Sequence, residues 1–213
     1  MGRCRKRLTN RDKWSSIILP FDGEVIHMRA VELRDRLECF PIIAAIRDDR
    51  WEAAISSPAE VLFCLECSLL TVEQKIRQAH DVGKIVFVHI DLSEGIGKDR
   101  AGLTYLAKCG VDGIISTKAQ LIRTAKDLGL LTVQRFFALD SQGMGSVLEM
   151  LKNTNPHFME IMPGVIPKVI ERLSKENIPV IAGGLIETKG EITAALGSGA
   201  TAISTGRPEL WEL

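Results

Sequence analysis

The sequence predicts an α/β fold, a compact (β/α)8 barrel of the TIM type with parallel strands. From residue 40 onward, eight short, nearly continuous apolar runs alternate with stretches of helical periodicity, a pattern typical of βαβ units whose strands are buried on both faces. No G-x-G-x-x-G follows the first run, although an open dinucleotide-binding sheet would need it. Glycines gather instead after the last two runs, where barrels often hold phosphate. An open, doubly wound sheet is the alternative architecture.

The eight strands follow one another at short intervals along the chain. We predict them at residues 40–46, 60–67, 84–91, 113–117, 131–138, 158–162, 179–184 and 202–206. Each run is short and rich in β-branched or apolar residues, as fully buried strands are. Pro179 opens the seventh run, where a missing backbone N–H is tolerated.

Helical periodicity fills the intervals between these runs. In residues 68–83 one stripe collects the apolar side chains Leu69, Val72, Ile76 and Ala79, and Gly83 ends the pattern. The same spacing predicts helices over 119–129, 141–153 and 165–177. The last predicted helix, at 208–213, is barely more than one turn.

The chain divides into a basic N-terminal extension, residues 1–39, and a barrel domain, residues 40–213. The first 13 residues carry six basic side chains and one acidic side chain, and we interpret them as a partly disordered terminus rather than as an RNA-contacting arm. His27-Met28 is a dipeptide that a common cloning site encodes, and Met28 would also serve as a natural start. We therefore expect residues 1–27 to be non-native or dispensable for folding.

Composition narrows the classes of function. The 213 residues include 27 Lys and Arg and 27 Asp and Glu, so the formal net charge is zero, and aromatic residues make up only 5%. An RNA site would therefore have to be a local basic patch rather than a global property of the chain. No uninterrupted apolar run reaches the roughly 18–20 residues that a bilayer requires, so we predict no membrane contact.

The five cysteines favour a reducing, cytoplasmic location, because their number is odd and their spacing irregular. Cys64 and Cys67 form a C-x-x-C, but on a single strand they would face opposite sides. No second pair follows, and no Asp, Glu or His set has a recognisable metal spacing. We therefore predict neither a metal nor a cofactor.

The strongest functional signal lies after the last two predicted strands. Gly183 and Gly184 end the seventh strand, and Ser204, Thr205 and Gly206 end the eighth. Residues without a Cβ let backbone amides approach a ligand closely, and hydroxyls beside a helix start favour an anion. We predict that these five residues form a phosphate cradle.

Polar residues at the ends of other strands predict a ligand rim. Strand alternation places His89 and Asp91 on one face, where they suit ligand contact or acid–base work. Glu66, Arg135 and Glu160 lie near the same rim, where Arg135 could pair with Glu66 or with a ligand phosphate. A satisfied barrel histidine and a structural ion pair are equally good interpretations of these residues.

Several strings together resemble the glycerol uptake operon antiterminator family, the glycerol-3-phosphate-responsive regulators of bacterial glycerol operons. They are HIDL at 89–92, DGIISTK at 112–118, VQRFFALDS at 133–141, EIMPGVIP at 160–167, PVIAGGLIET at 179–188 and LWE at 210–212. The resemblance covers about residues 40–213, whereas generic phosphate barrels share only the AGG-like and STG-like pieces.

The resemblance implies a non-catalytic, cytoplasmic barrel that senses glycerol 3-phosphate and binds the leader mRNA of glycerol-utilisation genes, with a homodimer as a possible assembly. Gly183, Gly184, Ser204 and Thr205 would hold the phosphate. The five rim residues would contact the glycerol hydroxyls. Candidate RNA contacts are the basic residues Lys98, Arg100, Lys118, Arg123 and Lys126, although a solvated helix face explains them equally well.

The alternative function is an enzyme acting on a phosphorylated triose or sugar, such as an isomerase, epimerase or aldolase. His89, Asp91 and Glu160 would then form an acid–base set. Lys118, just after the fourth strand, would be the Schiff-base candidate.

Overall fold

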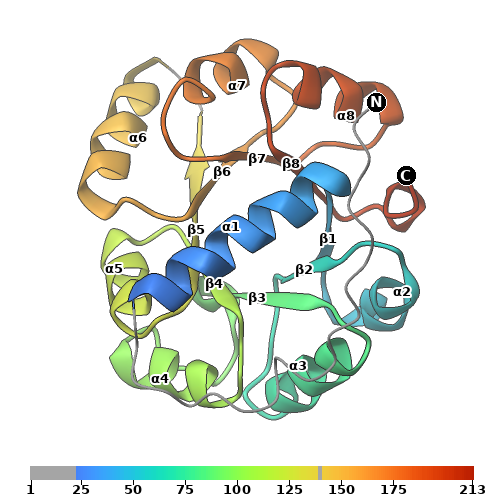
Figure 1. The fold of residues 1–213 in the computed structure, drawn as a ribbon, viewed down its shortest axis with the longest axis vertical. Helices are drawn as coiled ribbons and strands as arrows, with labels where there is room; N and C mark the ends of the chain where they lie inside the picture. The colour runs from blue at the N-terminus through green and yellow to red at the C-terminus, as the bar shows by residue number, and fades with distance from the viewer. Residues whose placement is uncertain (1–22, 139–140) are drawn as a thin grey trace.

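The chain folds into a closed barrel of eight parallel strands that pair in sequence order, β1 to β8 (Figure 1). The computed structural model describes residues 23–138 and 141–213. The strands are β1 (Ile42–Ile46), β2 (Val61–Cys64), β3 (Ile85–His89), β4 (Gly113–Ser116), β5 (Leu131–Phe137), β6 (Phe158–Met162), β7 (Val180–Gly183) and β8 (Ala202–Thr205). The predicted fold class is confirmed, and the pairing of β8 with β1 excludes the open sheet.

Helices surround the barrel as an outer layer (Figure 1). They are α2 (Trp51–Ser56), α3 (Val72–Asp81), α4 (Arg100–Lys108), α5 (Ala119–Asp127), α6 (Ser141–Thr154), α7 (Pro167–Leu173) and α8 (Lys189–Gly197). Short 3-10 helices η1 (Asp48–Arg50), η2 (Ile90–Leu92) and η3 (Pro208–Leu210) complete the described elements. All eight predicted strands are present, although most are shorter than predicted.

Strand alternation builds two separate cores. One face of each strand packs under the helices, where Val88, Ile114 and Ala182 belong to a large apolar cluster. The other face fills the barrel interior, where Ile43, Phe63 and Phe87 belong to a second cluster. The near-continuous apolar runs of the sequence are explained by this arrangement, because both faces of every strand are covered.

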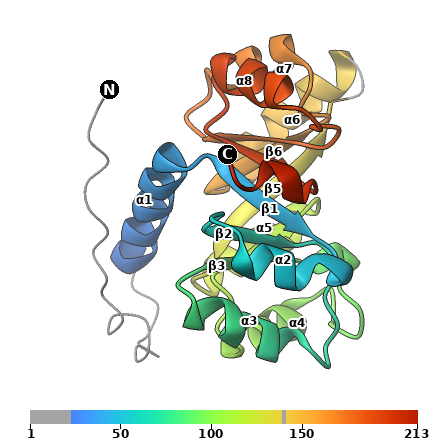
Figure 2. The same ribbon diagram turned by 90° about the vertical axis from the view of Figure 1, so that its right-hand side faces the viewer.

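Helices α1 (Gly23–Cys39), α2, α4 and α8 match none of the helices predicted by residue range. Helix α1 lies across one end of the barrel (Figures 1 and 2). Its Leu33 and Leu37 are only 2% and 1% exposed and pack with the interior cluster. Arg36 of the same helix pairs with Glu60 at 3.4 Å. Residues 1–22 lie outside the described residues, so the expectations for residues 1–27 and for a separate 1–39 extension stay predictions.

The segment before α3 differs from the prediction. Leu69 was placed on the apolar stripe of a helix over 68–83, but α3 begins only at Val72 and Leu69 is 39% exposed. The Leu69 amide donates to the Glu94 carbonyl, and the Glu94 amide donates to the Cys67 carbonyl. Residues 68–71 therefore join the loop after β2 to the loop after β3 instead of forming a first helical turn.

Candidate functional site

Five polar or small residues end the interior face of the strands at the end of the barrel away from α1. His89, Arg135, Glu160, Gly183 and Ser204 each lie two residues beyond a residue of the interior apolar cluster, so alternation points them toward the barrel axis. We call this set the mouth. Because the strands are parallel, all their carboxyl ends meet here, where barrel proteins bind ligands.

A buried ion pair is the main charged feature of the mouth. Arg135 of β5 and Glu160 of β6 are register partners, and the Arg135 Nε donates to Glu160 Oε2 at 2.7 Å. The two side chains are only 8% and 1% exposed. The two terminal amino groups of the guanidinium make no hydrogen bond to the described residues. The pair thus satisfies a carboxylate that would be costly to bury alone and leaves two charged donors at the mouth.

The His89 imidazole, which is 3% exposed, is neutral near pH 7. Burial is the main cause that lowers the pKa of His89 to about 4, and the positive charge of Arg135 contributes in the same direction. Its Nδ1 is buried without a hydrogen-bond partner in the described part of the chain. Buried polar atoms are rarely left unpaired, so this ring is a candidate ligand contact.

Asp91 does not continue the face of His89 as predicted, because β3 ends at His89 and Asp91 lies in η2. Its carboxylate accepts hydrogen bonds from the Ser116 hydroxyl at 2.8 Å and from the Thr117 amide and hydroxyl at 2.7 and 2.9 Å. Burial opposes ionisation, but these bonds prevail and the pKa of Asp91 is lowered. Asp91 therefore ties the end of β3 to the end of β4. The sequence signal for this pairing was the Ser116-Thr117 dipeptide at the end of β4, which was not recognised from the sequence.

Glu66 lies on an exposed loop after β2 rather than among the mouth residues. Its carboxylate pairs with Arg47 at 3.4 Å, and both side chains are exposed. The flanking Cys64 and Cys67 are joined by a disulfide. The expectation that these cysteines face opposite sides was wrong, because β2 ends at Cys64 and the chain then turns.

The surroundings of Gly183, which ends β7, and of Gly184, which follows it, require glycine at both positions. A Cβ on Gly183 would lie 2.5 Å from Glu160 Oε1, and one on Gly184 would lie 2.6 Å from Met162 Cε. Gly184 also has a φ of +74°, a left-handed conformation that favours glycine. The predicted reason for these glycines was close ligand approach, and the structure shows neighbouring side chains as a further reason.

The residues that end β8 divide between structure and mouth. The Thr205 hydroxyl donates to the Ile186 carbonyl at 2.9 Å, and the Thr205 carbonyl accepts from Trp211 Nε1 at 2.8 Å. Thr205 therefore joins the loop after β7 to the segment that follows η3. Ser204, in contrast, faces the barrel interior. The amides of Gly184 and Gly206 donate to no described residue. These two amides and the Ser204 hydroxyl are the parts of the predicted cradle that remain for an anion.

Lys118 lies outside the mouth, exposed at the N-cap of α5. Partial burial lowers the pKa of Lys98. The positive charge of Lys118 also lowers this pKa, whereas the negative charge of Asp91 raises it. The two lysines therefore lie near each other on the rim. Among residues 23–138 and 141–213, no group of three or more Cys, His, Asp or Glu side chains is arranged to hold a metal.

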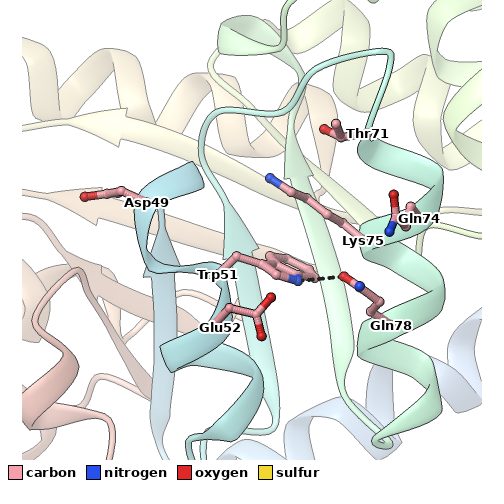
Figure 3. Close-up of a pocket in the computed structure, with 7 residues that line it drawn as sticks. All are labelled: Asp49, Trp51, Glu52, Thr71, Gln74, Lys75 and Gln78. Carbon is pink, nitrogen blue, oxygen red and sulfur yellow. Dashed lines mark hydrogen bonds between the residues drawn. The ribbon is translucent and has the colours of Figure 1, made fainter.

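A polar cavity of about 310 Å³ lies between α2 and α3, on the outer layer (Figure 3). Its floor is the indole of Trp51, whose Nε1 donates to Gln78 Oε1 at 3.0 Å. The Lys75 ammonium lies 5.4 Å from the centre of the same ring. None of the residues that line this cavity belongs to the mouth, so the cavity is separate from it.

Residues 42–211 match the sequence model of a family described as glycerol-3-phosphate responsive antiterminator. The chain is 32% identical to the glycerol uptake operon antiterminator regulatory protein of Listeria monocytogenes, with a TM-score of 0.76, covering 81% of this chain and 95% of that one. For an antiterminator-related protein of Thermotoga maritima the identity is 34%, the TM-score 0.73 and the coverage 81% and 98%.

The chain is also 31% identical to the uncharacterized protein YgcP of Escherichia coli K12 over 176 residues. These residues make up 81% of this chain and 92% of YgcP. A deoxyribose phosphate aldolase of Aeropyrum pernix is 13% identical with a TM-score of 0.61, covering 88% of this chain and 95% of the aldolase, and shares the fold alone. No helix within the described ranges is long and apolar enough to cross a membrane. The family resemblance predicted from the sequence is confirmed, and the chain belongs to the glycerol-3-phosphate responsive antiterminator family.

Proposed function

We propose that the protein is a non-catalytic sensor of glycerol 3-phosphate that binds the leader mRNA of glycerol-utilisation genes in the cytoplasm. The observation that carries this proposal is the family match over residues 42–211, which spans every strand of the barrel. The mouth supports it, because buried charged and polar side chains end a barrel that is otherwise apolar inside.

The ligand fits the mouth by chemistry. The amides of Gly184 and Gly206 and the hydroxyl of Ser204 would receive the phosphate, as backbone donors do in barrel phosphate sites. The neutral imidazole of His89 would exchange a hydrogen bond with a glycerol hydroxyl. No metal or organic cofactor enters this scheme.

The state of the carboxylates supports a binding role over the enzyme alternative. Asp91 accepts three hydrogen bonds and Glu160 is paired with Arg135, so neither is a free base for proton transfer. Lys118, the Schiff-base candidate, is exposed at the N-cap of α5 and is not one of the buried mouth residues. An assay for turnover of triose and pentose phosphates tests the enzyme alternative directly.

A basic strip on the α4–α5 side of the rim is the proposed RNA contact. Lys98 and Arg100 lie at the start of α4, and Lys118 and Arg123 lie on the neighbouring α5. Lys126 belongs elsewhere, because its ammonium bonds to the Thr154 and Asn155 carbonyls. The ligand would favour an RNA-competent conformer or homodimer and so shift its population.

An RNA mobility shift with and without glycerol 3-phosphate tests this proposal. We expect the double variant Lys98→Gln/Lys118→Gln to bind the leader RNA at least about tenfold more weakly and with a shallower dependence on salt. The matched control is Lys168→Gln/Lys175→Gln beside α7, on the other side of the barrel (Figure 1). Ligand-independent binding, or equal losses in the two double variants, would contradict the proposal.

A further inference from the structure

We propose that Arg135 supplies the charged contact to the phosphate of the ligand, that Glu160 is the residue that positions Arg135, and that Gly183 is glycine in order to leave room for Glu160. This inference rests on the proposed function. It changes the predicted roles of Gly183, which serves a side chain rather than the ligand, and of Glu160, which positions Arg135 rather than binding a glycerol hydroxyl. For Arg135 it selects the phosphate contact from the roles that the sequence left open.

The three residues form a continuous chain of contacts across adjacent strands. Arg135 and Glu160 face each other in the register of β5 and β6, and β6 pairs with β7, which ends at Gly183. One carboxylate oxygen, Oε2, accepts from Arg135 Nε at 2.7 Å. The other, Oε1, lies 2.5 Å from the point that a Cβ on Gly183 would occupy. A methyl group there would push the carboxylate, and with it the guanidinium.

The manner of pairing leaves Arg135 available to an anion. A guanidinium has five N–H donors, and its parallel fork of two donors is the arrangement that binds carboxylate and phosphate best. Glu160 takes only the Nε donor, and the terminal amino groups make no hydrogen bond to the described residues. An ion pair with only a structural role would be more stable if two parallel guanidinium donors bonded to the carboxylate. The single hydrogen bond from Nε orients the guanidinium, and it leaves the N–H donors of both terminal amino groups available to an anion.

The electrostatics of the mouth agree with this role. Arg135 is 8% exposed and Glu160 only 1%, so the cation lies nearer to the opening than its partner. The charge of Arg135 also acts on the neighbouring His89, which stays neutral. A mouth with a cation at its surface and a carboxylate beneath it favours a phosphorylated polyol over the free polyol.

A double-variant cycle separates the two roles of Gly183. Gly183→Ala is made in the unmodified protein and in a Glu160→Asp background, where the carboxylate keeps its charge but withdraws by one methylene. Calorimetric dissociation constants are measured for sn-glycerol 3-phosphate and for glycerol. We expect Gly183→Ala to weaken binding of sn-glycerol 3-phosphate about tenfold in the unmodified protein and less than about twofold in the Glu160→Asp background, a coupling of at least about fivefold, or about 1 kcal/mol.

The ratio of the affinities for sn-glycerol 3-phosphate and glycerol provides a second readout. This ratio would not change if Arg135 had only a structural role. Arg135→Lys keeps the positive charge and removes the fork, so it should weaken sn-glycerol 3-phosphate about tenfold while changing glycerol binding by less than about twofold. This variant also replaces Gly183→Ala as the test if the alanine variant does not fold.

Equal losses for Gly183→Ala in both backgrounds would overturn the inference, because the glycine would then be needed by the ligand itself. Parallel losses for both ligands in Arg135→Lys would overturn it as well. A failure of the unmodified protein to bind sn-glycerol 3-phosphate would instead reject the proposed function, and this inference with it.

Discussion

The two ends of the barrel contrast sharply in what fills them. At the end covered by α1, Leu33 and Leu37 insert among interior residues that are all apolar. At the mouth the same strand faces finish in His89, Arg135 and Glu160, which are nearly as buried. The apolar end is an ordinary hydrophobic core, whereas the mouth buries charge that must be paired. This difference agrees with the proposed function, in which the ligand binds at the mouth and the α1 end contributes to stability.

The contrast follows from strand geometry. Interior positions recur every second residue, so each strand offers two or three layers to the barrel axis. Ile85 and Phe87 provide apolar layers on β3, and His89 provides the polar one. A barrel of this kind can change its mouth residues without changing the layers beneath, which is how one fold serves many ligands.

The largest expected effect is at the mouth. Arg135→Met leaves the Glu160 carboxylate buried without its partner, and breaking a buried pair lowers the free energy of unfolding by about 3–5 kcal/mol. Urea unfolding measures the loss. The double variant Arg135→Met/Glu160→Leu should recover most of it while still failing to bind sn-glycerol 3-phosphate. A single variant as stable as the unmodified protein would show that the pair is not buried as described.

The matching change at the other end is Leu37→Ala, which opens a cavity under α1. It should lower the free energy of unfolding by about 2–5 kcal/mol and leave the affinity of the folded protein for sn-glycerol 3-phosphate unchanged. Urea unfolding and calorimetry on the same sample test both parts. A loss of affinity larger than twofold would mean that the two ends are not separate in function.

The pH dependence of stability should report on His89. Its pKa is about 4 in the folded protein and about 6.5 when exposed, so the unfolded chain takes up a proton first as the pH falls. Stability from this group is therefore complete above pH 6.5 and is lost between about pH 6.5 and 4, by at most about 3 kcal/mol. His89→Gln should remove this part of the pH dependence in urea unfolding. A variant that retained the full slope would assign it to another group.

The smallest expected effect on the free energy of unfolding comes from a residue on the rim that is not part of the mouth. Thr188 caps α8, with its hydroxyl accepting from the Glu191 amide at 3.2 Å and Glu191 bonding back to the Thr188 amide at 2.9 Å. Thr188→Ala should cost about 1 kcal/mol of unfolding free energy with no change in ligand affinity. An altered affinity would extend the site to the start of α8.

The barrel itself was predictable from the sequence. Strands that are buried on both faces produce continuous apolar runs, and glycines separate these runs from the neighbouring elements. Helix α1 was not, because its only described buried apolar side chains, Leu33 and Leu37, are few among many charged neighbours. A helix that plugs a barrel needs only a narrow apolar contact, and the sequence pattern of such a contact is weak.

The site was predictable in its position but not in its internal bonding. His89, Arg135, Glu160, Gly183 and Ser204 were chosen for their places near the carboxyl ends of the strands, and the structure gathers them at one mouth. Asp91 and Thr205 were chosen in the same way, yet both are engaged in bonds to neighbouring loops. Which hydroxyl or amide a side chain meets depends on the register of separate strands, and one sequence does not carry that information.

Calorimetric titration with sn-glycerol 3-phosphate, glycerol and inorganic phosphate tests the central claim most directly. The mouth should bind sn-glycerol 3-phosphate more tightly than either fragment, and the ligand at 100 times its dissociation constant should add about 2.7 kcal/mol to the free energy of unfolding. Arg135→Lys should remove the preference for the phosphorylated compound. Binding that is absent, or that does not distinguish sn-glycerol 3-phosphate from glycerol, would contradict the assignment of the mouth as the sensor site.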